Sequence, residues 1–153
     1  ECPFIYAHGA DQVIESHLEG NYDFTTFHSL PLGMNYELIN ARILFEMANT
    51  GDPRYQGALS LYIKENQERF KTRLLSPMES CQHPELNLAI DHPAQLLFAQ
   101  GVVRSLRGVR LPYPSEKIIK YADDNPIMLS LLNSIGEDVY AVRSDQTMAR
   151  VWA

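Results

Sequence analysis

Residues 38–53 read Leu-Ile-Asn-Ala-Arg-Ile-Leu-Phe-Glu-Met-Ala-Asn-Thr-Gly-Asp-Pro, and this stretch decides the expected fold. Five apolar residues recur in it at the spacing of one helix face: Leu38, Ile39, Ile43, Leu44 and Met47. Gly51 is a helix stop signal, and Asp52-Pro53 is a start signal. The stretch therefore predicts a helix, a short turn and a second helix that returns antiparallel to the first.

The second helix is expected to run from Pro53 to Arg73. Its apolar residues share one face, and charged residues fill the other. The pair from Asn40 to Phe70 resembles the helix pair of tetratricopeptide and Sel1-type repeats in its small-residue turn and in Tyr55, Ala58 and Tyr62. This resemblance implies stacked helix pairs. A non-repetitive helical domain is the alternative, because the rest of the chain shows no constant repeat length.

The remaining segments add helices and a little β structure. Composition predicts short strands at 4–7 and 22–27 around a helix that ends at Gly20. Further helices are expected after the capping-type residue and proline pairs Ser76-Pro77, His83-Pro84, His92-Pro93 and Asn125-Pro126, and at 116–122. Residues 138–152 fit a β-hairpin or a helix. The expected class is mainly α (α+β), with antiparallel helix hairpins and a small β element from the N-terminal strands and a possible C-terminal hairpin.

The length and composition of the chain limit which class of protein it can be. The chain has 153 residues, 45% of them hydrophobic and 21% charged, with a net charge of -6. We expect one soluble globular domain over residues 1–153, and a fragment or a processed chain, because it begins at Glu1 without methionine. No apolar run reaches the roughly 20 residues of a membrane span. The acidic balance disfavours nucleic acid as a partner, and the compartment stays open.

Cysteine and histidine concentrate in one segment. Cys81, His83 and His92 could supply soft and imidazole ligands to a zinc ion, although their spacing matches no established motif. In the alternative, the two histidines only precede helix-starting prolines, and Cys81 is a small buried residue. A single bridge between Cys2 and Cys81 also stays open.

Three arginines, Arg104, Arg107 and Arg110, recur every third residue. Neighbouring guanidinium groups would form a site for a small carboxylate or phosphate ligand. Alternatively, they compensate the dipole at the end of a helix that stops before Gly108.

The amino-terminal part also carries a family resemblance. Residues 6–9, Tyr-Ala-His-Gly, and the strand at 24–29 resemble segments of ADP-ribosyltransferases. The resemblance implies that His8 and Thr26 contact nicotinamide-adenine dinucleotide, and that Glu65 or Glu68 is the catalytic acid. The match covers about a fifth of the chain, and no serine or threonine follows Gly9 as the family pattern requires.

These observations predict a helical protein-interaction or adaptor module with a protein partner. Tyrosines are frequent at interface hot spots, and Tyr55 and Tyr113 are the contact candidates. No catalytic fingerprint supports a cofactor, so none is predicted, with NAD and zinc left as alternatives. The alternative function is an enzyme acting on a nucleotide or other anionic small molecule, ADP-ribosyltransferase-like or a hydrolase, through His8, His28 and Glu68.

Overall fold

The computed structural model describes residues 1–55 and 59–132. The helices are α1 (Ala10–Gly20), α2 (Ala41–Thr50), α3 (Leu59–Glu65), α4 (Pro93–Ser105) and α5 (Ser115–Asp123), and the strands are β1 (Phe24–Phe27), β2 (Glu37–Ile39) and β3 (Thr72–Leu75). Short 3-10 helices lie at η1 (Ala7–Gly9), η2 (Pro53–Tyr55), η3 (Gln67–Arg69) and η4 (Glu79–Cys81). Residues 126–132 are also helical.

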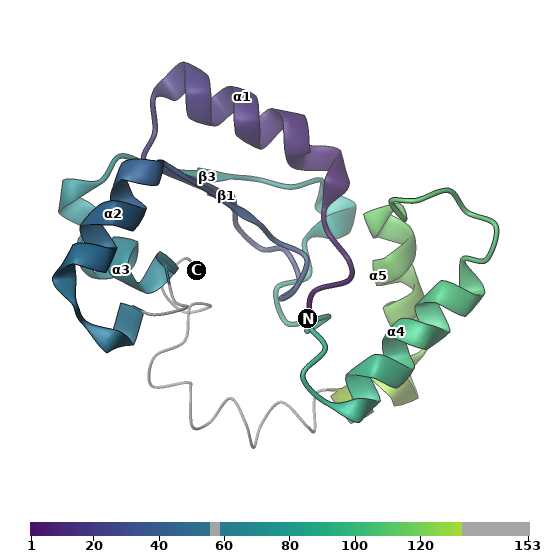
Figure 1. Ribbon diagram of the computed structural model, residues 1–153. Coiled ribbons are helices and arrows are strands. Elements are labelled where there is room, and N and C mark those ends of the chain that lie inside the picture. Colours follow the sequence, from purple (N-terminus) through teal and green to yellow (C-terminus); the bar gives the residue numbers. More distant parts are fainter. Residues whose placement is uncertain (56–58, 133–153) are drawn as a thin grey trace.

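A mixed sheet forms the centre of the molecule (Figure 1). The described strands are ordered β2-β1-β3, with β1 antiparallel to β2 and parallel to β3. A parallel pair needs a long crossover connection, and here the crossover contains α2 and α3. Helices therefore pack around a sheet. The predicted bundle of antiparallel helix hairpins is wrong. The second helix of its main hairpin was expected to run to Arg73, but the chain forms strand β3 from Thr72.

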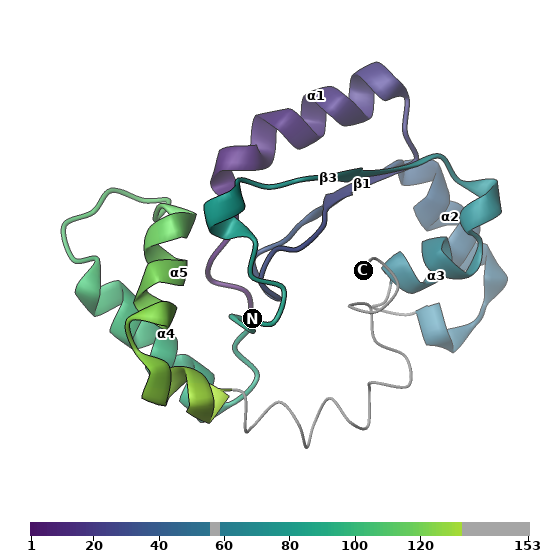
Figure 2. The ribbon, with the colours of Figure 1, turned by 180° about the vertical axis from the view of Figure 1, so that it is seen from behind.

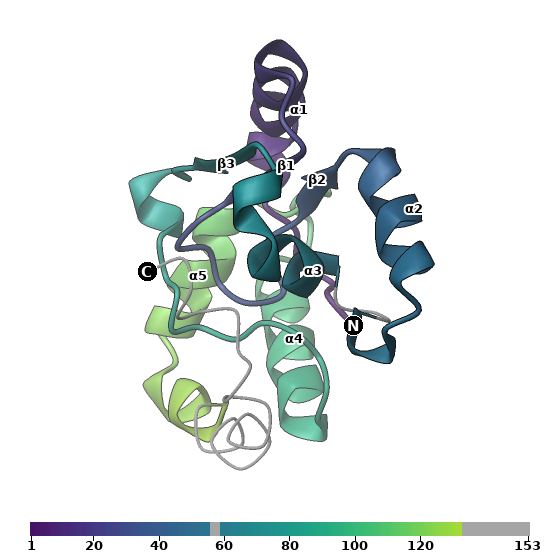
Figure 3. The ribbon, with the colours of Figure 1, turned by 90° about the vertical axis from the view of Figure 1, so that its left-hand side faces the viewer.

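The two faces of the sheet carry two hydrophobic cores. Phe24 and Phe27 lie three residues apart on β1, so their side chains point to opposite faces. Phe27 joins the larger core, which includes Val13 of α1. Phe24 joins a second core with Ile43 of α2 and Ile63 of α3. Figure 3 shows this layering, with α1 above the strands and α3 below them.

Helix α1 is attached to the sheet by a buried polar pair as well as by apolar packing. His17 and Thr25 are both buried, and His17 Nδ1 lies 3.0 Å from Thr25 Oγ1. The helix ends at Gly20, and Asn21 follows it in the left-handed conformation that commonly caps a helix. The predicted helix ending at Gly20 is therefore confirmed, and so is the strand that follows it.

Helices α4 and α5 pack against each other on the other side of the molecule from α2 and α3 (Figures 1 and 2). Their contact includes the rings of Phe98 and Tyr121, whose centroids lie 5.5 Å apart. The side chain of Gln95 accepts hydrogen bonds from the backbone N–H groups of Asp91 and His92, at 2.8 and 2.9 Å, and so caps the start of α4. The helices predicted at His92-Pro93 and at 116–122 are confirmed.

Several other predicted elements are wrong or lie outside the described residues. The helix expected from Pro53 to Arg73 is replaced by η2, α3, η3 and β3. Phe4 and Tyr6 are buried in the larger core, but residues 4–6 form no strand. The helices expected after Ser76-Pro77 and His83-Pro84 are absent from that described segment, which contains only η4. The hairpin considered for residues 138–152 lies outside the described residues.

The remaining global features concern cysteine and the membrane. Cys2 is exposed and Cys81 is buried, and both are free thiols. Within residues 1–55 and 59–132, no helix combines the length and the apolar character needed to cross a bilayer.

Candidate functional site

The carboxyl ends of β1 and β3 lie side by side because the two strands are parallel. Phe27 is opposite Leu75, the last residue of β3, and the backbone N–H of His28 donates to the carbonyl of Leu75 at 3.0 Å. His28 and Ser76 are therefore the first residues beyond the two strands. In α/β folds, ligands bind outside the carboxyl ends of the strands.

Three polar side chains are linked at this edge. His28 Nδ1 lies 2.8 Å from Ser29 Oγ, and His28 Nε2 lies 2.8 Å from Ser76 Oγ. We refer to His28, Ser29 and Ser76 as the serine–histidine cluster. A neutral imidazole donates from one nitrogen and accepts at the other, so one serine receives a hydrogen bond and the other donates one. The cluster can therefore take up a proton from a hydroxyl group.

The backbone around the cluster is fixed in an unusual conformation. Ser29 has a φ of 57°, in the left-handed region that residues other than glycine seldom adopt. The carbonyl of Ser29 accepts a hydrogen bond from the N–H of His83 at 2.9 Å. Beyond β3, the N–H of Met78 donates to the hydroxyl of Tyr6 at 3.1 Å. These contacts fix the loop after β1, which carries His28 and Ser29, and the loop after β3, which carries Ser76.

The amino-terminal segment pairs through its backbone with residue 90, next to Asp91. The N–H of Ile90 donates to the carbonyl of Glu1 at 2.7 Å, and the amino group of Glu1 donates to the carbonyl of Ile90 at 3.0 Å. Asp91 is thus one residue away from this pairing. Glu1 and Asp91 are both exposed, and their carboxylates have no partner among the described residues.

The zinc candidates do not form a cluster in the described part of the chain. Cys81 is buried, and burial raises the pKa of its thiol. His83 Nε2 is instead hydrogen-bonded to Asp123 at 3.1 Å, and its Nδ1 lies 3.0 Å from a carboxylate oxygen of Glu85. His92 is the N-cap residue of α4. Within residues 1–55 and 59–132, no group of three or more His, Cys, Asp or Glu side chains is placed to hold a metal ion.

The catalytic candidates from the sequence lie in separate places. His8, on η1, lines a cavity of about 180 Å³ together with Tyr113 and the first residues of α5. Glu68 is exposed on η3, before the amino end of β3, and so lies at the opposite end of that strand from His28. Thr26 is buried and donates to the carbonyl of Tyr36 at 2.9 Å. Glu65 is paired with Arg54 and Tyr55 on the far side of the sheet, whereas His28 is linked to two serine hydroxyl groups at the carboxyl ends of β1 and β3.

The other candidates divide between surface and core. Arg104, Arg107 and Arg110 are exposed around the end of α4, and they form no ion pair with any described residue. Tyr113 is half-buried beside His8. Tyr55 is buried in the second core, where its hydroxyl donates to Glu65 at 2.7 Å. The structure thus places the two tyrosines in different surroundings.

Ser29 and Ser76 were missed by reasoning from the sequence. Ser76 was interpreted as a helix cap because it precedes Pro77, and β3 was interpreted as helix. The available signal was Leu74-Leu75 followed by Ser-Pro, which also fits a strand end. Ser29 carried a weaker signal, as a turn residue directly after a predicted strand.

Comparison with known proteins gives two matches and overturns the main functional prediction. No family model matches the chain. Over 91 residues it is 28% identical to the spore coat polysaccharide biosynthesis protein SpsF of Bacillus subtilis, covering 58% of this chain and 38% of that protein. Together with the solved structure described next, this match contradicts the predicted helix-hairpin, protein-interaction module and favours the alternative, an enzyme acting on a nucleotide or other anionic small molecule.

The second match is a solved structure. A cytidylyltransferase from Leptospira borgpetersenii superposes with a TM-score of 0.71 at 19% identity, over 84% of this chain and 55% of that one. The chain thus spans little more than half of the solved structure and less than half of the curated relative. At this level of identity the likeness concerns architecture, and the chain has the fold of the corresponding part of a cytidylyltransferase.

Proposed function

We propose that this chain is part of a nucleotidyltransferase that transfers a cytidylyl group from CTP to a hydroxyl group of a sugar. The fold likeness to a cytidylyltransferase supports the nucleotide, and the relative in polysaccharide biosynthesis supports the sugar. The observation that carries the proposal is the serine–histidine cluster at the carboxyl ends of β1 and β3. This is the edge at which α/β folds bind their ligands.

His28 is the general base in this proposal. The sugar oxygen attacks the α-phosphorus of CTP, a new P–O bond forms and the bond to pyrophosphate breaks, while the sugar hydroxyl proton passes to Ser76 Oγ and the Ser76 proton passes to His28 Nε2. That nitrogen already lies 2.8 Å from a hydroxyl oxygen, that of Ser76, which is within the distance a base needs. Ser29 contacts Nδ1 and orients the ring.

Glu1 and Asp91 are the candidate residues for a magnesium ion. Magnesium is commonly held by one or two carboxylates together with substrate phosphates, rather than by a complete cage of protein ligands. The two unpartnered carboxylates beside the Glu1–Ile90 backbone pairing fit that pattern. When bound, the ion would neutralise charge on the triphosphate.

The test is pyrophosphate release by the purified protein from CTP, magnesium and a panel of sugars. We expect activity with at least one sugar, and we expect His28→Gln to lower kcat by about a hundredfold, the contribution typical of a general base. His8→Gln is the matched control, because His8 is an exposed histidine outside the cluster. It should leave kcat unchanged.

Two results would overturn this proposal. One is the absence of both CTP binding and pyrophosphate release with every sugar of the panel. The other is a His28→Gln variant whose kcat equals that of the unaltered protein, which would remove His28 from the chemistry.

A further inference from the structure

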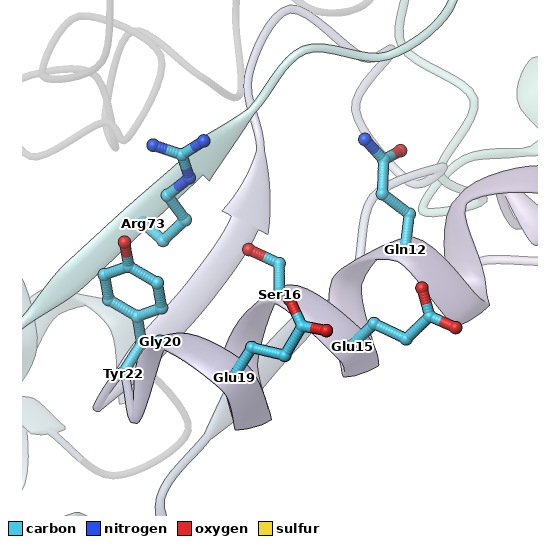
Figure 4. A pocket seen from close by; sticks show the side chains of 7 residues that line it. All are labelled: Gln12, Glu15, Ser16, Glu19, Gly20, Tyr22 and Arg73. Atoms are coloured by element: carbon cyan, nitrogen blue, oxygen red, sulfur yellow. The ribbon is translucent and has the colours of Figure 1, made fainter.

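A polar groove of about 490 Å³ lies between α1 and the amino ends of the strands. Seven residues line it: Gln12, Glu15, Ser16, Glu19, Gly20, Tyr22 and Arg73 (Figure 4). We call it the α1 groove. Tyr22 precedes β1 and Arg73 is the second residue of β3, so the groove lies at the opposite ends of these strands from the serine–histidine cluster.

Most polar side chains of the α1 groove are not engaged in hydrogen bonds or ion pairs within the described part of the chain. Those of Gln12, Glu15, Ser16, Glu19 and Arg73 make no hydrogen bond or ion pair with any residue that the structure describes. Arg42, Arg54 and Arg69 each pair with a carboxylate, whereas Arg73, like Arg104, Arg107 and Arg110, has no ion-pair partner among the described residues. Figure 4 shows Gln12 and Ser16 rising from α1 toward the same side as Tyr22 and Arg73. These groups are therefore available to a ligand.

The aromatic residue of the groove is held in place before any ligand arrives. Lys71 Nζ lies 4.8 Å from the centroid of the Tyr22 ring and donates to the carbonyl of Gly20 at 2.6 Å. A Cβ atom at position 20 would overlap the Tyr22 ring, so the ring occupies space that only glycine leaves free. Preorganisation of this kind lowers the entropy cost of binding.

The chemistry of the lining selects a neutral ligand rich in hydroxyl groups. Glu15 and Glu19 accept hydrogen bonds, Arg73 donates them, and the amide and hydroxyl side chains do both. Glu15 and Glu19 are balanced by Arg73 and by Lys71 beside the Tyr22 ring, so the groove has no net charge that would attract a phosphate or carboxylate ligand. A sugar can donate its hydroxyl protons to the glutamates and accept from the arginine. The groove is open to solvent along its outer side, and its volume lies within the range of about 300–1,000 Å³ that ligand sites occupy.

We infer that the α1 groove binds a neutral saccharide, at a site separate from the proposed cytidylyl-transfer site. Nothing in the inference requires the chain to have transferase activity, because it rests on the groove's own lining. Its location predicts that saccharide and nucleotide bind to different ends of the same strands.

The test is a nuclear magnetic resonance titration of the protein with maltotriose, cellotriose and chitotriose, preceded by a screen on an array of neutral glycans. We expect saturable shifts at the amides of residues 12–22 and of Arg73, and none at His28 and Ser76. Glu19→Gln should raise Kd by about tenfold, since it weakens a hydrogen bond to a charged acceptor.

Two further variants separate binding from folding. Gly20→Ala displaces the Tyr22 ring, and it should weaken saccharide binding while the circular dichroism of the protein is retained. Leu18→Gln changes an exposed side chain of α1 outside the groove and should leave Kd unchanged.

The inference fails if no neutral glycan gives saturable shifts, or if Glu19→Gln and Gly20→Ala both bind as the unaltered protein does. It also fails if CTP shifts the groove amides as the glycan does. Saccharide binding without pyrophosphate release would refute only the proposed transferase activity, and the reverse result would refute only the saccharide site.

Discussion

Asp23 shows how one buried carboxylate can fix several segments. It is 9% exposed, and its side chain accepts from Arg42 at 2.5 Å and from the N–H of Lys71 at 3.0 Å. Its carbonyl accepts from the N–H of Asn40 at 2.9 Å. Since Asn40 caps α2 and Lys71 precedes β3, Asp23 joins the beginnings of β1, α2 and β3. Charged hydrogen bonds of this kind are stronger than neutral ones.

At the level of single residues, one member of the proposed site, His28, was already a candidate from the sequence. His28 stood out because histidine suits proton transfer and followed a predicted strand. Its partners could not be predicted, because the contact between His28 and Ser76 spans 48 residues and depends on the pairing of β1 with β3. Local patterning carries no information on such a pairing.

Tyr36 gives a prediction on alkaline stability. Burial, helped by the nearby Tyr6 and Asp11, raises the pKa of Tyr36 from 10.0 to about 12. Because the pKa is raised on folding, the resulting stabilisation is fully present below pH 10.0 and is lost as the pH rises toward 12. Tyr36→Phe removes this pH-dependent loss of stability. It also removes the hydrogen bond from the Tyr36 hydroxyl to the Tyr6 carbonyl. We expect the variant to be about 1 kcal/mol less stable below pH 10.

The measurement is urea unfolding of both proteins at several pH values up to about 12. The free energy of unfolding should fall more steeply with pH in the unaltered protein, so that the two curves converge. Parallel curves throughout this range would show that Tyr36 does not titrate as described.

At the level of elements, β3 explains why the fold was predicted incorrectly. Its sequence, Thr-Arg-Leu-Leu, follows a charged stretch with helical spacing, and the amphipathic pattern continued into it. The structure ends α3 at Glu65 and makes residues 72–75 a strand, because pairing with β1 satisfies its backbone groups. The helix that ends at Gly51 was predicted correctly at that end, but Leu38 and Ile39 of its predicted apolar stripe lie on β2, and α2 begins after the cap residue Asn40.

The turn at Gly33 gives a prediction at this scale. Gly33 has a φ of +84°, and a Cβ there would lie 2.5 Å from the backbone nitrogen of Ala89. Gly51 has a φ of +65°, but a Cβ there would meet nothing within 4 Å. Gly51→Ala should therefore cost only the strain of the left-handed conformation, about 1 kcal/mol. Gly33→Ala adds the clash with residue 89 and should cost about 3 kcal/mol.

Chemical denaturation of the two variants tests this difference. Since both glycines have positive φ, Gly51→Ala is the matched control for backbone strain. Equal losses in the two variants would mean that residues 33 and 89 are not packed closely together.

At the level of the whole molecule, the sheet separates two cores that should respond independently to mutation. Phe24→Leu loosens the second core, so amide exchange should accelerate in α2 and α3. Phe27→Leu loosens the larger core, so exchange should accelerate in α4 and α5. Each change should cost about 1 kcal/mol, as reshaping swaps between large apolar residues do. Hydrogen–deuterium exchange with mass spectrometry measures both variants.

The same acceleration in all four helices for both variants would contradict two separate cores. A third variant, Phe45→Leu, controls for the loss of an aromatic ring, because Phe45 is largely exposed. Its exchange pattern should match that of the unaltered protein.

The class of function depended on the whole fold and was predicted incorrectly. Apolar helix stripes and tyrosines suggested an adaptor, but Ile43 of α2 and Ile63 of α3 are buried with Phe24 of the sheet, and Tyr55 lies in the same core. The nucleotide-related alternative came from histidines and carboxylates, which carry chemistry whatever the fold around them. The sequence contains no phosphate-binding motif, so local patterns gave the nucleotide-related alternative little support.

The crossover between β1 and β3 also has a consequence for synthesis on the ribosome. Residues 28–71 separate the two strands, so β1 leaves the ribosome well before its parallel partner. At about 5–20 residues per second, the edge of Phe-Thr-Thr-Phe stays unpaired for on the order of a few seconds. Unpaired edges invite contact with other nascent chains. Translation pauses between these segments would lengthen that interval and increase the need for a chaperone.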